Sequence, residues 1–402
     1  MTYDIREHLT PKRATIAMWD YSWLTAHYPG GAFADFDRVT DELMERGFNT
    51  VRIDAFPWIV GQMNRPDEMV TIPGNPLANW GMSDRDREHA VGFELADFME
   101  ITRRKGIYVI LSTWGAGCRQ YPDRKPEAFL AVWEKTLSYL QQHALLDHVL
   151  YIDLDQEFPY FSAHQQDLNE LSPGQTGGNQ ADGAMAAAGR RQPQRGLAWN
   201  EAQLDFVANL FKRSLAHFHQ LYPAQRFTFS LTSFWNECRL LDLKALDVLE
   251  LHCWVHGARF DNRTGFNDIV KDRGQHDYVD YQRRIDDTLK AVRPMLLGEM
   301  HRRLASAAAW AAELSAPLTT TEAWGPWWHM DHPQLRWDWL RDWCAECNAL
   351  AGEYGFWGST PWNYSHPYWQ NWMDIGWYQQ VNQAFLKSKK KEGEHAVARE
   401  GL

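Results

Sequence analysis

Short apolar runs alternate with amphipathic stretches along the whole chain, and this alternation is its main structural signal. Short runs rich in β-branched and aromatic residues predict buried strands, whereas apolar positions that recur every turn of a helix predict helices. The predicted strands are Ala14–Trp19, Asn49–Phe56, Ile107–Trp114, the start of His148–Phe161, Arg226–Trp235, Leu246–His256, Pro317–Trp324 and Gly355–Trp362.

Amphipathic stretches separate these strands, near Phe33–Arg46, Asp84–Lys105, Pro126–Ala144 and Glu201–Leu221. A repeating strand–helix order implies a parallel sheet, and eight such units imply a (β/α)8 TIM barrel. We therefore predict an α/β fold of this type, formed by a single (β/α)8 domain over residues 1–402.

The run Arg293–Met300 could add a ninth strand that ends near Glu299. Its apolar positions, however, continue at helical spacing through Leu296, Met300 and Leu304. We predict a helix here, with Pro294 at a kink or at the helix start.

Two irregular stretches follow the fourth and sixth strands. Residues 172–196 are rich in Gly, Pro and Gln and predict a long low-complexity loop, and residues 257–275 predict a second irregular connection. Both lie on the carboxyl side of strands, where barrel enzymes build their active sites. Residues 386–402 predict a polar C-terminal tail.

Composition narrows the class of protein. The net charge is −11, and the basic run Lys387–Lys391 is typical of a solvated tail, so we expect no nucleic-acid partner. The N-terminal residues lack the apolar segment of a signal peptide, and no apolar run is long enough to span a bilayer. Five scattered cysteines are typical of free thiols in a reducing compartment. We predict a cytoplasmic protein with no membrane partner.

The chain has 21 tryptophans, and an aromatic residue stands at the end of each predicted strand. These residues are Trp19, Trp58, Trp114, Phe158, Trp235, Trp254, Trp324 and Trp362. One interpretation is that the rings plug the barrel top. The other is a sugar site, because flat rings stack on the C–H faces of pyranoses while nearby polar groups bind hydroxyls. The Trp337–Trp343 helix likewise fits either a surface for a homo-oligomer or the core.

The fourth strand runs directly into carboxylates. Asp153, Asp155 and Glu157 alternate with Ile152 and Leu154, so the acids should face the barrel interior. By the same alternation, the second strand directs Arg52 and Asp54 to its interior face, and the sixth directs Glu250, His252 and Trp254 to that face. Arg52 would offset this negative charge; a purely structural polar core is the alternative.

A second rim acid, Glu322, ends the seventh strand. Carboxylates on the fourth and seventh strands face each other across a barrel mouth. At about 5 Å, that is the arrangement of a retaining glycosidase, with one nucleophile and one acid/base.

The chain resembles the (β/α)8 glycoside hydrolases of the cellulase-like clan that includes family 5. The matching motifs are "DLDQEF" with Glu157, "PLTTTEAWG" with Glu322, Arg52 on the second strand and "STPWNY" with Trp362. The resemblance implies that Glu157 is the acid/base and Glu322 the nucleophile. It also implies that Arg52 supports Glu322 and that Trp362 floors the sugar subsite. Gln156 stands where the clan usually has Asn, which bears on the contact with the sugar's 2-hydroxyl.

We therefore expect a retaining, exo-acting, β-specific glycosidase of small oligosaccharides or glycosides that needs no cofactor and no metal. The predicted substrate contacts are Trp19, Arg52, Asp54, Trp114, Gln156, Trp235, His252, Trp254, Trp324, Trp362 and Asn363.

One alternative is a catalytically inactive sugar-binding barrel. A less favoured one is a metal-dependent barrel hydrolase, because the His-x-His pair His217/His219 lies within a predicted helix and Cys344/Cys347 form a lone C-x-x-C.

Overall fold

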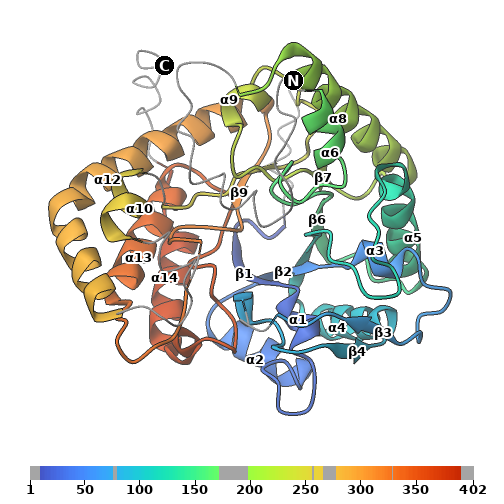
Figure 1. Cartoon of the computed structure of the whole chain (residues 1–402), viewed down its shortest axis with the longest axis horizontal. Coiled ribbons are helices and arrows are strands. Elements are labelled where there is room, and N and C mark those ends of the chain that lie inside the picture. Colours follow the sequence, from blue (N-terminus) through green and yellow to red (C-terminus); the bar gives the residue numbers. More distant parts are fainter. Residues whose placement is uncertain are drawn as a thin grey trace.

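The computed structural model describes residues 10–75, 79–171, 198–255, 258–265, 278–327 and 329–390. Its centre is a ring of parallel strands enclosed by helices (Figure 1). The strands are β1 (Ala14–Asp20), β2 (Thr50–Asp54), β5 (Tyr108–Ser112), β6 (Val149–Asp153), β7 (Phe227–Thr228), β8 (Leu249–Glu250), β9 (Leu318–Thr320) and β10 (Gly358–Ser359). Each overlaps a predicted strand.

The strands pair in the order β7-β6-β5-β2-β1-β10-β9-β8. A parallel bridge between Leu231 and Leu251, just beyond β7 and β8, joins the two ends of this order. The predicted (β/α)8 barrel is therefore confirmed.

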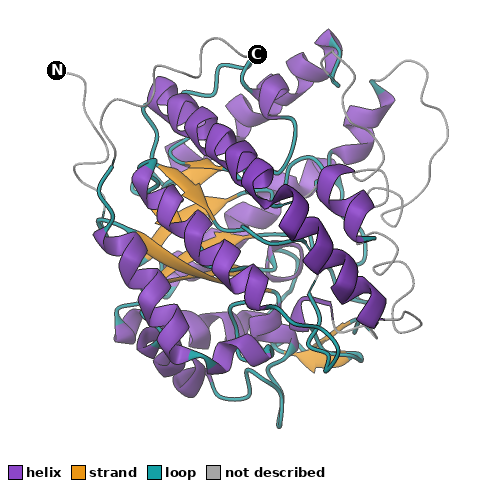
Figure 2. Ribbon diagram, turned by 90° about the vertical axis from the view of Figure 1, so that its left-hand side faces the viewer, coloured by secondary structure: helices purple, strands orange, loops and turns teal. Residues whose placement is uncertain are grey.

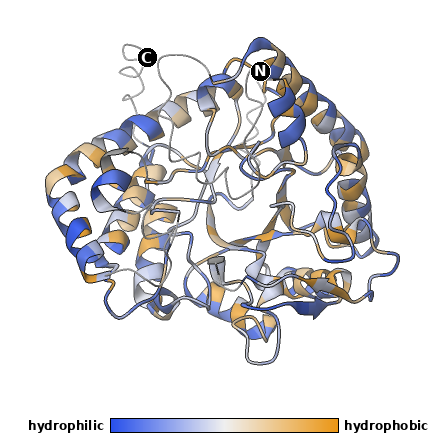
Figure 3. Cartoon of the chain, in the orientation of Figure 1, coloured by the Kyte–Doolittle hydropathy of each residue, from blue (hydrophilic) through white to orange (hydrophobic). Residues whose placement is uncertain are grey.

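Long helices cover the outside of the ring, and Figure 2 shows the strands enclosed between them. They are α2 (Phe36–Glu45), α4 (Val91–Lys105), α5 (Phe129–Gln142), α8 (Glu201–Leu221), α12 (Tyr278–Leu314), α13 (Asp338–Glu353) and α14 (Ile375–Lys387). Shorter helices are α1 (Ser22–Thr25), α3 (Pro57–Val60), α6 (Gln165–Glu170), α9 (Trp235–Cys238) and α10 (Ala258–Thr264), with 3-10 turns η2 (Asn79–Gly81), η3 (Pro126–Ala128) and η4 (Gln370–Met373). Figure 3 shows that these helices carry apolar and polar faces, as expected for a layer between core and water.

The ambiguous run Arg293–Met300 lies inside α12, so its helical prediction is confirmed. Leu296, Met300 and Leu304 are buried on one face of that helix. Pro294 lies in the helix interior rather than at its start.

Strand alternation divides the core into two parts. On β1, Ala14 and Ile16 belong to a small apolar cluster with Tyr151 and Trp357. Ala17 and Trp19 instead belong to the large cluster, which also contains the buried residues of the surrounding helices. A one-residue step along a strand thus decides whether a side chain faces the barrel axis or the helices.

Four local expectations need correction or fall outside the described residues. An antiparallel hairpin, β3 (Val70–Ile72) and β4 (Arg87–His89), was not predicted, and the helix expected from Asp84 begins at Val91. In the stretch 257–275, residues 258–264 form α10 rather than an irregular connection. The predicted loop 172–196 lies outside the described residues. Helix α14 reaches Lys387, two residues into the predicted tail.

Within the described ranges, no helix has the length and the apolar character that crossing a bilayer requires.

Candidate active site

The two predicted catalytic glutamates lie together at the barrel mouth. One ligand atom from each of Glu157, His252 and Glu322 lies within 4.8 Å of the other two. Glu322 follows the end of β9, and its side chain is 0% exposed. The side chain of Glu157 keeps 11% exposure.

Glu157 reaches this position through a turn, not through the strand alternation that the sequence suggested. Strand β6 ends at Asp153, and Glu157 has a left-handed backbone with φ of 51°. Its N–H donates to Ser230 Oγ at 3.0 Å, which ties the turn to the end of β7. A non-glycine residue in this conformation is unfavourable, and such positions cluster at functional sites.

His252 lies between the two carboxylates. Its Nδ1 is 2.9 Å from Glu157 Oε1 and 3.5 Å from Glu322 Oε2, and its Nε2 is 3.6 Å from Glu250 Oε1. Burial disfavours the imidazolium, but the negative charges of Glu322, Glu157 and Glu250 outweigh it and raise the pKa of His252 to about 10. These carboxylates thus favour the protonated ring.

Arg52 is the second buried cation, with 0% exposure. It makes a bidentate pair with Asp20, with both N–O distances 2.9 Å. It also donates to Glu322 Oε1 at 2.5 Å and lies 3.5 Å from Glu250 Oε1. Arg52 thus contacts Glu322, as the resemblance implied, and offsets the buried negative charge.

Gln156 contacts Glu322 as well. Its Nε2 donates to Glu322 Oε1, while its main-chain N–H donates to Thr113 O at 3.1 Å. Burial raises the pKa of Glu322 to about 8, although the cations His252 and Arg52 act in the opposite direction. The amide that stands in place of the clan's Asn is thus bound to the carboxylate of Glu322.

Several buried polar atoms at this site have no hydrogen-bond partner among the described residues. They include Gln156 Oε1, Glu322 Oε2, Trp362 Nε1 and Asn363 Nδ2. Unpaired buried polar atoms are costly and uncommon in folded proteins. Four of them among the predicted site residues indicate donors and acceptors kept for a polar ligand.

Aromatic rings surround the carboxylates. Trp114 Nε1 donates to Asp20 Oδ2 at 2.8 Å, and Trp254 Nε1 donates to Glu157 Oε1 at 3.4 Å. Trp80 lies in η2, in the connection between β3 and β4; we call residues 70–89 the β3–β4 arm. The Trp80 ring contacts the rings of Trp114, Trp254 and Tyr364. The structure thus brings Trp254 to Glu157 and Trp114 to Asp20, the partner of Arg52.

Other predicted aromatic contacts face the helices. Trp19 packs against Phe33, Phe98 and Trp372, and Trp324 packs against Phe356. Trp58 and Phe158, which the strand-end pattern also placed at the mouth, are buried in the same large core cluster. The expected convergence of all eight aromatic residues is therefore not observed.

The remaining predicted contacts have structural partners. Asp54 is buried and accepts main-chain N–H groups of Phe56 at 2.7 Å and Trp114 at 2.9 Å; burial raises its pKa to about 7. Trp235 donates to Leu231 O at 3.2 Å, and the guanidinium of Arg303 lies over its ring.

Trp362 and Asn363 follow β10. The Trp362 ring packs edge-on against His329 at 5.2 Å, and Asn363 Oδ1 accepts the N–H of Ala323, the residue after Glu322, at 2.6 Å. Asn363 therefore ties the end of β10 to the segment that carries Glu322.

The sequence interpretation missed four residues of the site: Asp20, Tyr21, Trp80 and Tyr364. Asp20 directly follows the apolar run of β1, so an acid at a strand end was a usable signal. Tyr21 comes next in the chain and packs against Trp114, and the nearby carboxylates add to burial in raising its pKa. Trp80 and Tyr364 lie in connections without a periodic pattern.

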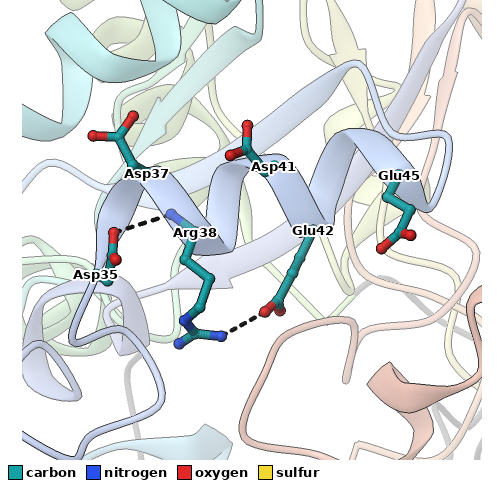
Figure 4. A pocket seen from close by; sticks show the side chains of 6 residues that line it. All are labelled: Asp35, Asp37, Arg38, Asp41, Glu42 and Glu45. Carbon is teal, nitrogen blue, oxygen red and sulfur yellow. Dashed lines mark hydrogen bonds and ion pairs between the residues drawn. The ribbon is translucent and has the colours of Figure 1, made fainter.

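Figure 4 shows a hollow elsewhere, along α2 outside the barrel. It is lined by Asp35, Asp37, Arg38, Asp41, Glu42 and Glu45. Four of its acids form ion pairs: Glu42 with Arg38 at 2.5 Å, Asp37 with Arg104 at 2.6 Å, Asp41 with Lys105 at 2.6 Å and Glu45 with Arg46 at 3.5 Å. The hollow shares no residue with the site at the mouth, and its charges have structural roles.

The trio Glu157, His252 and Glu322 is compact enough to share a metal ion. A metal-binding imidazole must be neutral, whereas the pKa of His252 is raised to about 10. The Arg52 guanidinium already occupies Glu322 Oε1. Both positive charges oppose a cation, so this donor set fits a metal poorly.

Comparisons with known proteins agree with this picture. The model of the cellulase-like family, which is described as "sugar-binding cellulase-like", matches residues 16–386. The crystal structure of a candidate glycoside hydrolase from Parabacteroides distasonis aligns with a TM-score of 0.75 and 24% identity, covering 96% of this chain and 98% of that one.

More distant structures include two from Rhizomucor miehei. A glycoside hydrolase family 5 mannosidase aligns with a TM-score of 0.44 and 12% identity, covering 93% of each chain. An endo-1,4-beta-mannanase aligns with a TM-score of 0.47 and 9% identity, covering 94% of this chain and 97% of that one. No curated protein matches the sequence.

The family model spans nearly the whole barrel, including every residue of the site at its mouth. The chain therefore belongs to the sugar-binding cellulase-like family of (β/α)8 barrels.

Proposed function

We propose that the protein is a retaining glycoside hydrolase that acts on the terminal residue of a small β-linked oligosaccharide or glycoside. The observation that carries this proposal is the pair of carboxylates at the barrel mouth. A carboxylate oxygen of Glu157 lies within 4.8 Å of one of Glu322. This is near the separation of about 5 Å that is typical of the two carboxyl groups of a retaining glycosidase.

The two glutamates have different surroundings, and this difference assigns their roles. Glu322 Oε1 accepts from Arg52 and Gln156, whereas Oε2 has no hydrogen-bond partner among the described residues. Oε2 is therefore the oxygen that can attack an anomeric carbon. Arg52 and Gln156 fix the carboxylate and stabilise its charge.

Glu157 is the more exposed of the pair, as a group that meets the leaving oxygen and then water should be. His252 and Trp254 hold its Oε1. Glu157 therefore serves as the acid/base.

In the first step, Glu322 Oε2 forms a bond to the anomeric carbon while the glycosidic bond breaks. The leaving oxygen takes the proton of Glu157. In the second step, Glu157 takes a proton from water as the water oxygen attacks the same carbon, and the bond to Glu322 breaks. Protons and electron pairs balance over the two steps, and no cofactor is consumed.

The sugar's hydroxyls require partners within the site. The unpaired Gln156 Oε1 and Asn363 Nδ2 are one acceptor and one donor that a sugar could satisfy. Trp114 and Trp254 supply flat apolar surface beside them.

The test is hydrolysis of a panel of α- and β-linked aryl glycosides by the wild type, Glu322→Ala and Glu157→Ala. Glu127→Gln, a change at an exposed glutamate on η3, is the matched control. We expect loss on the order of 10⁴-fold in kcat for Glu322→Ala. Added azide should restore turnover and yield a glycosyl azide of inverted configuration.

Glu157→Ala should still release good aryl leaving groups, because these need no protonation. With azide, it should give a glycosyl azide of retained configuration. If both alanine variants match the wild type on a cleaved substrate, the assignment is wrong. If no glycoside is cleaved but sugars bind, the family's sugar-binding description applies without catalysis. Loss of wild-type activity in a chelator would favour the metal-dependent alternative.

A further inference from the structure

Four aromatic rings lie together at the barrel mouth, beside the buried glutamate pair. Glu322 is 0% exposed, and Glu157 keeps only a small exposed fraction. Three of these rings, Trp114, Trp254 and Tyr364, follow β5, β8 and β10, so they come from different sides of the mouth. The fourth, Trp80, comes from outside the strand–helix repeat, in the arm that carries β3 and β4.

Trp80 contacts all three of the other rings. It stacks on Tyr364 with centroids 5.2 Å apart and an interplanar angle of 21°. It meets Trp254 edge-on at 6.0 Å and Trp114 at 6.2 Å. Since Trp254 binds Glu157 and Trp114 binds Asp20, the Trp80 ring spans the mouth beside the carboxylates.

The backbone holds Trp80 in this place. Trp80 itself has a left-handed φ of 58°, and the following Gly81 has a φ of 72°. A Cβ on Gly81 would lie 2.4 Å from Cε1 of His366, so only glycine fits against that ring. The carbonyl of Trp80 accepts a hydrogen bond from Ser22 Oγ. The turn is thus fixed to the segments after β1 and after β10.

We propose that Trp80 is the wall that ends the sugar-binding groove, so that the site accepts only the end of a glycan chain. This inference rests on the proposed function and names the residue that sets its exo specificity. A chain that crossed the mouth would have to occupy the volume of the Trp80 ring. A terminal residue can instead stop against it.

The test compares the wild type with Trp80→Ala, Trp80→Leu and Trp80→Phe. The control Met69→Ala alters the same arm at a side chain that is 54% exposed and lies outside the ring cluster. The probes are cellopentaose and mannopentaose, each used free and also blocked, by a ketal at the non-reducing end and by reduction at the other. Circular dichroism and thermal melting confirm that each variant is folded.

We expect the wild type, Trp80→Phe and Met69→Ala to cleave a free pentasaccharide and to leave its blocked form intact. Trp80→Ala should cleave the blocked form internally, at a rate at least about tenfold above the background measured with the wild type. Trp80→Leu should be intermediate, and it keeps the test available if the alanine variant does not fold.

The outcomes separate the two ideas. Suppose that the wild type cleaves free glycans, but the folded Trp80→Ala and Trp80→Leu variants do not cleave the blocked ones. The proposal that Trp80 ends the groove is then wrong, whereas the proposed hydrolase activity stands. Internal cleavage by the wild type also refutes the wall. If the wild type cleaves neither the pentasaccharides nor any aryl glycoside, the proposed function fails and the wall fails with it.

Discussion

Replacing His252 by Gln should destabilise the protein by an amount that depends strongly on pH. Glutamine keeps a polar side chain but removes the cation that lies 2.9 Å from Glu157 and 3.5 Å from Glu322. A histidine whose folded-state pKa is raised contributes stability that is fully present below its unfolded pKa. That stability is lost as the pH rises through the folded pKa.

The magnitude follows from the shift. The pKa of His252 rises from 6.5 to about 10, and each pH unit corresponds to about 1.4 kcal/mol. His252→Gln should therefore lower the free energy of unfolding by about 5 kcal/mol at pH 6 and by about 1 kcal/mol at pH 9.5. The first figure is an upper value, because the charge of Glu322 contributes to the raised pKa of His252, and Glu322, with a pKa of about 8, is largely protonated at pH 6.

Urea unfolding of both proteins at these two pH values measures the difference, with His143→Gln, at an exposed position, as the control. In the same variant, the acid limb of the kcat/KM profile should move to higher pH, because Glu322 loses a neighbouring cation. A loss in unfolding free energy that is equal at both pH values would refute the assignment of a buried imidazolium.

Three further predictions concern the same buried charges. Burial raises the pKa of Asp155 to about 7, so the wild type loses folding free energy as the pH rises from about 4 to 7 and this side chain ionises. In urea unfolding, the free energy of unfolding of Asp155→Asn should therefore increase relative to that of the wild type by up to about 4 kcal/mol between pH 4 and pH 8. A difference that stays constant over this range would contradict the prediction. The pKa of Glu322 is about 8, and a nucleophilic carboxylate must be ionised. The kcat/KM of the wild type on a cleaved aryl glycoside should therefore rise with pH through about 8. A flat profile from pH 6 to 9 would count against Glu322 as the nucleophile. Gln156→Leu removes a hydrogen-bond donor to Glu322. It should lower kcat about 10- to 100-fold and shift the acid limb of the kcat/KM profile to higher pH. An unchanged acid limb would show that the Gln156 amide contacts only the sugar.

The barrel could be predicted because its signal is long and repeated. Each strand is an apolar run flanked by a helix, and even the ambiguous Arg293–Met300 was resolved by helical spacing. The β3–β4 hairpin could not be predicted in the same way. Its strands have three residues each, too few to show an alternation.

Site residues could be predicted where a charged side chain lies in or directly after a predicted strand. They could not be predicted where membership of the site depends on the direction in which a side chain points. Glu322 and Arg52 follow directly from their strands. Trp19 and Trp324 also stand at strand ends, but they point to the helices, because a one-residue step reverses the face. Trp80 reaches the mouth from an arm whose position depends on tertiary contacts, such as the fit of Gly81 against His366.

The pairing of β1 with β10 has a consequence for how activity can arise. It joins Ala14 to Gly358, whereas most other strand pairs in the ring connect neighbours in the chain. During synthesis, β1 must wait for a partner that emerges last, and long-range pairings of this kind form slowly. Arg52 depends on Asp20 at the end of β1, and Glu322 depends on Arg52. The arrangement of Asp20, Arg52 and Glu322 should therefore appear in a single step, when the ring closes.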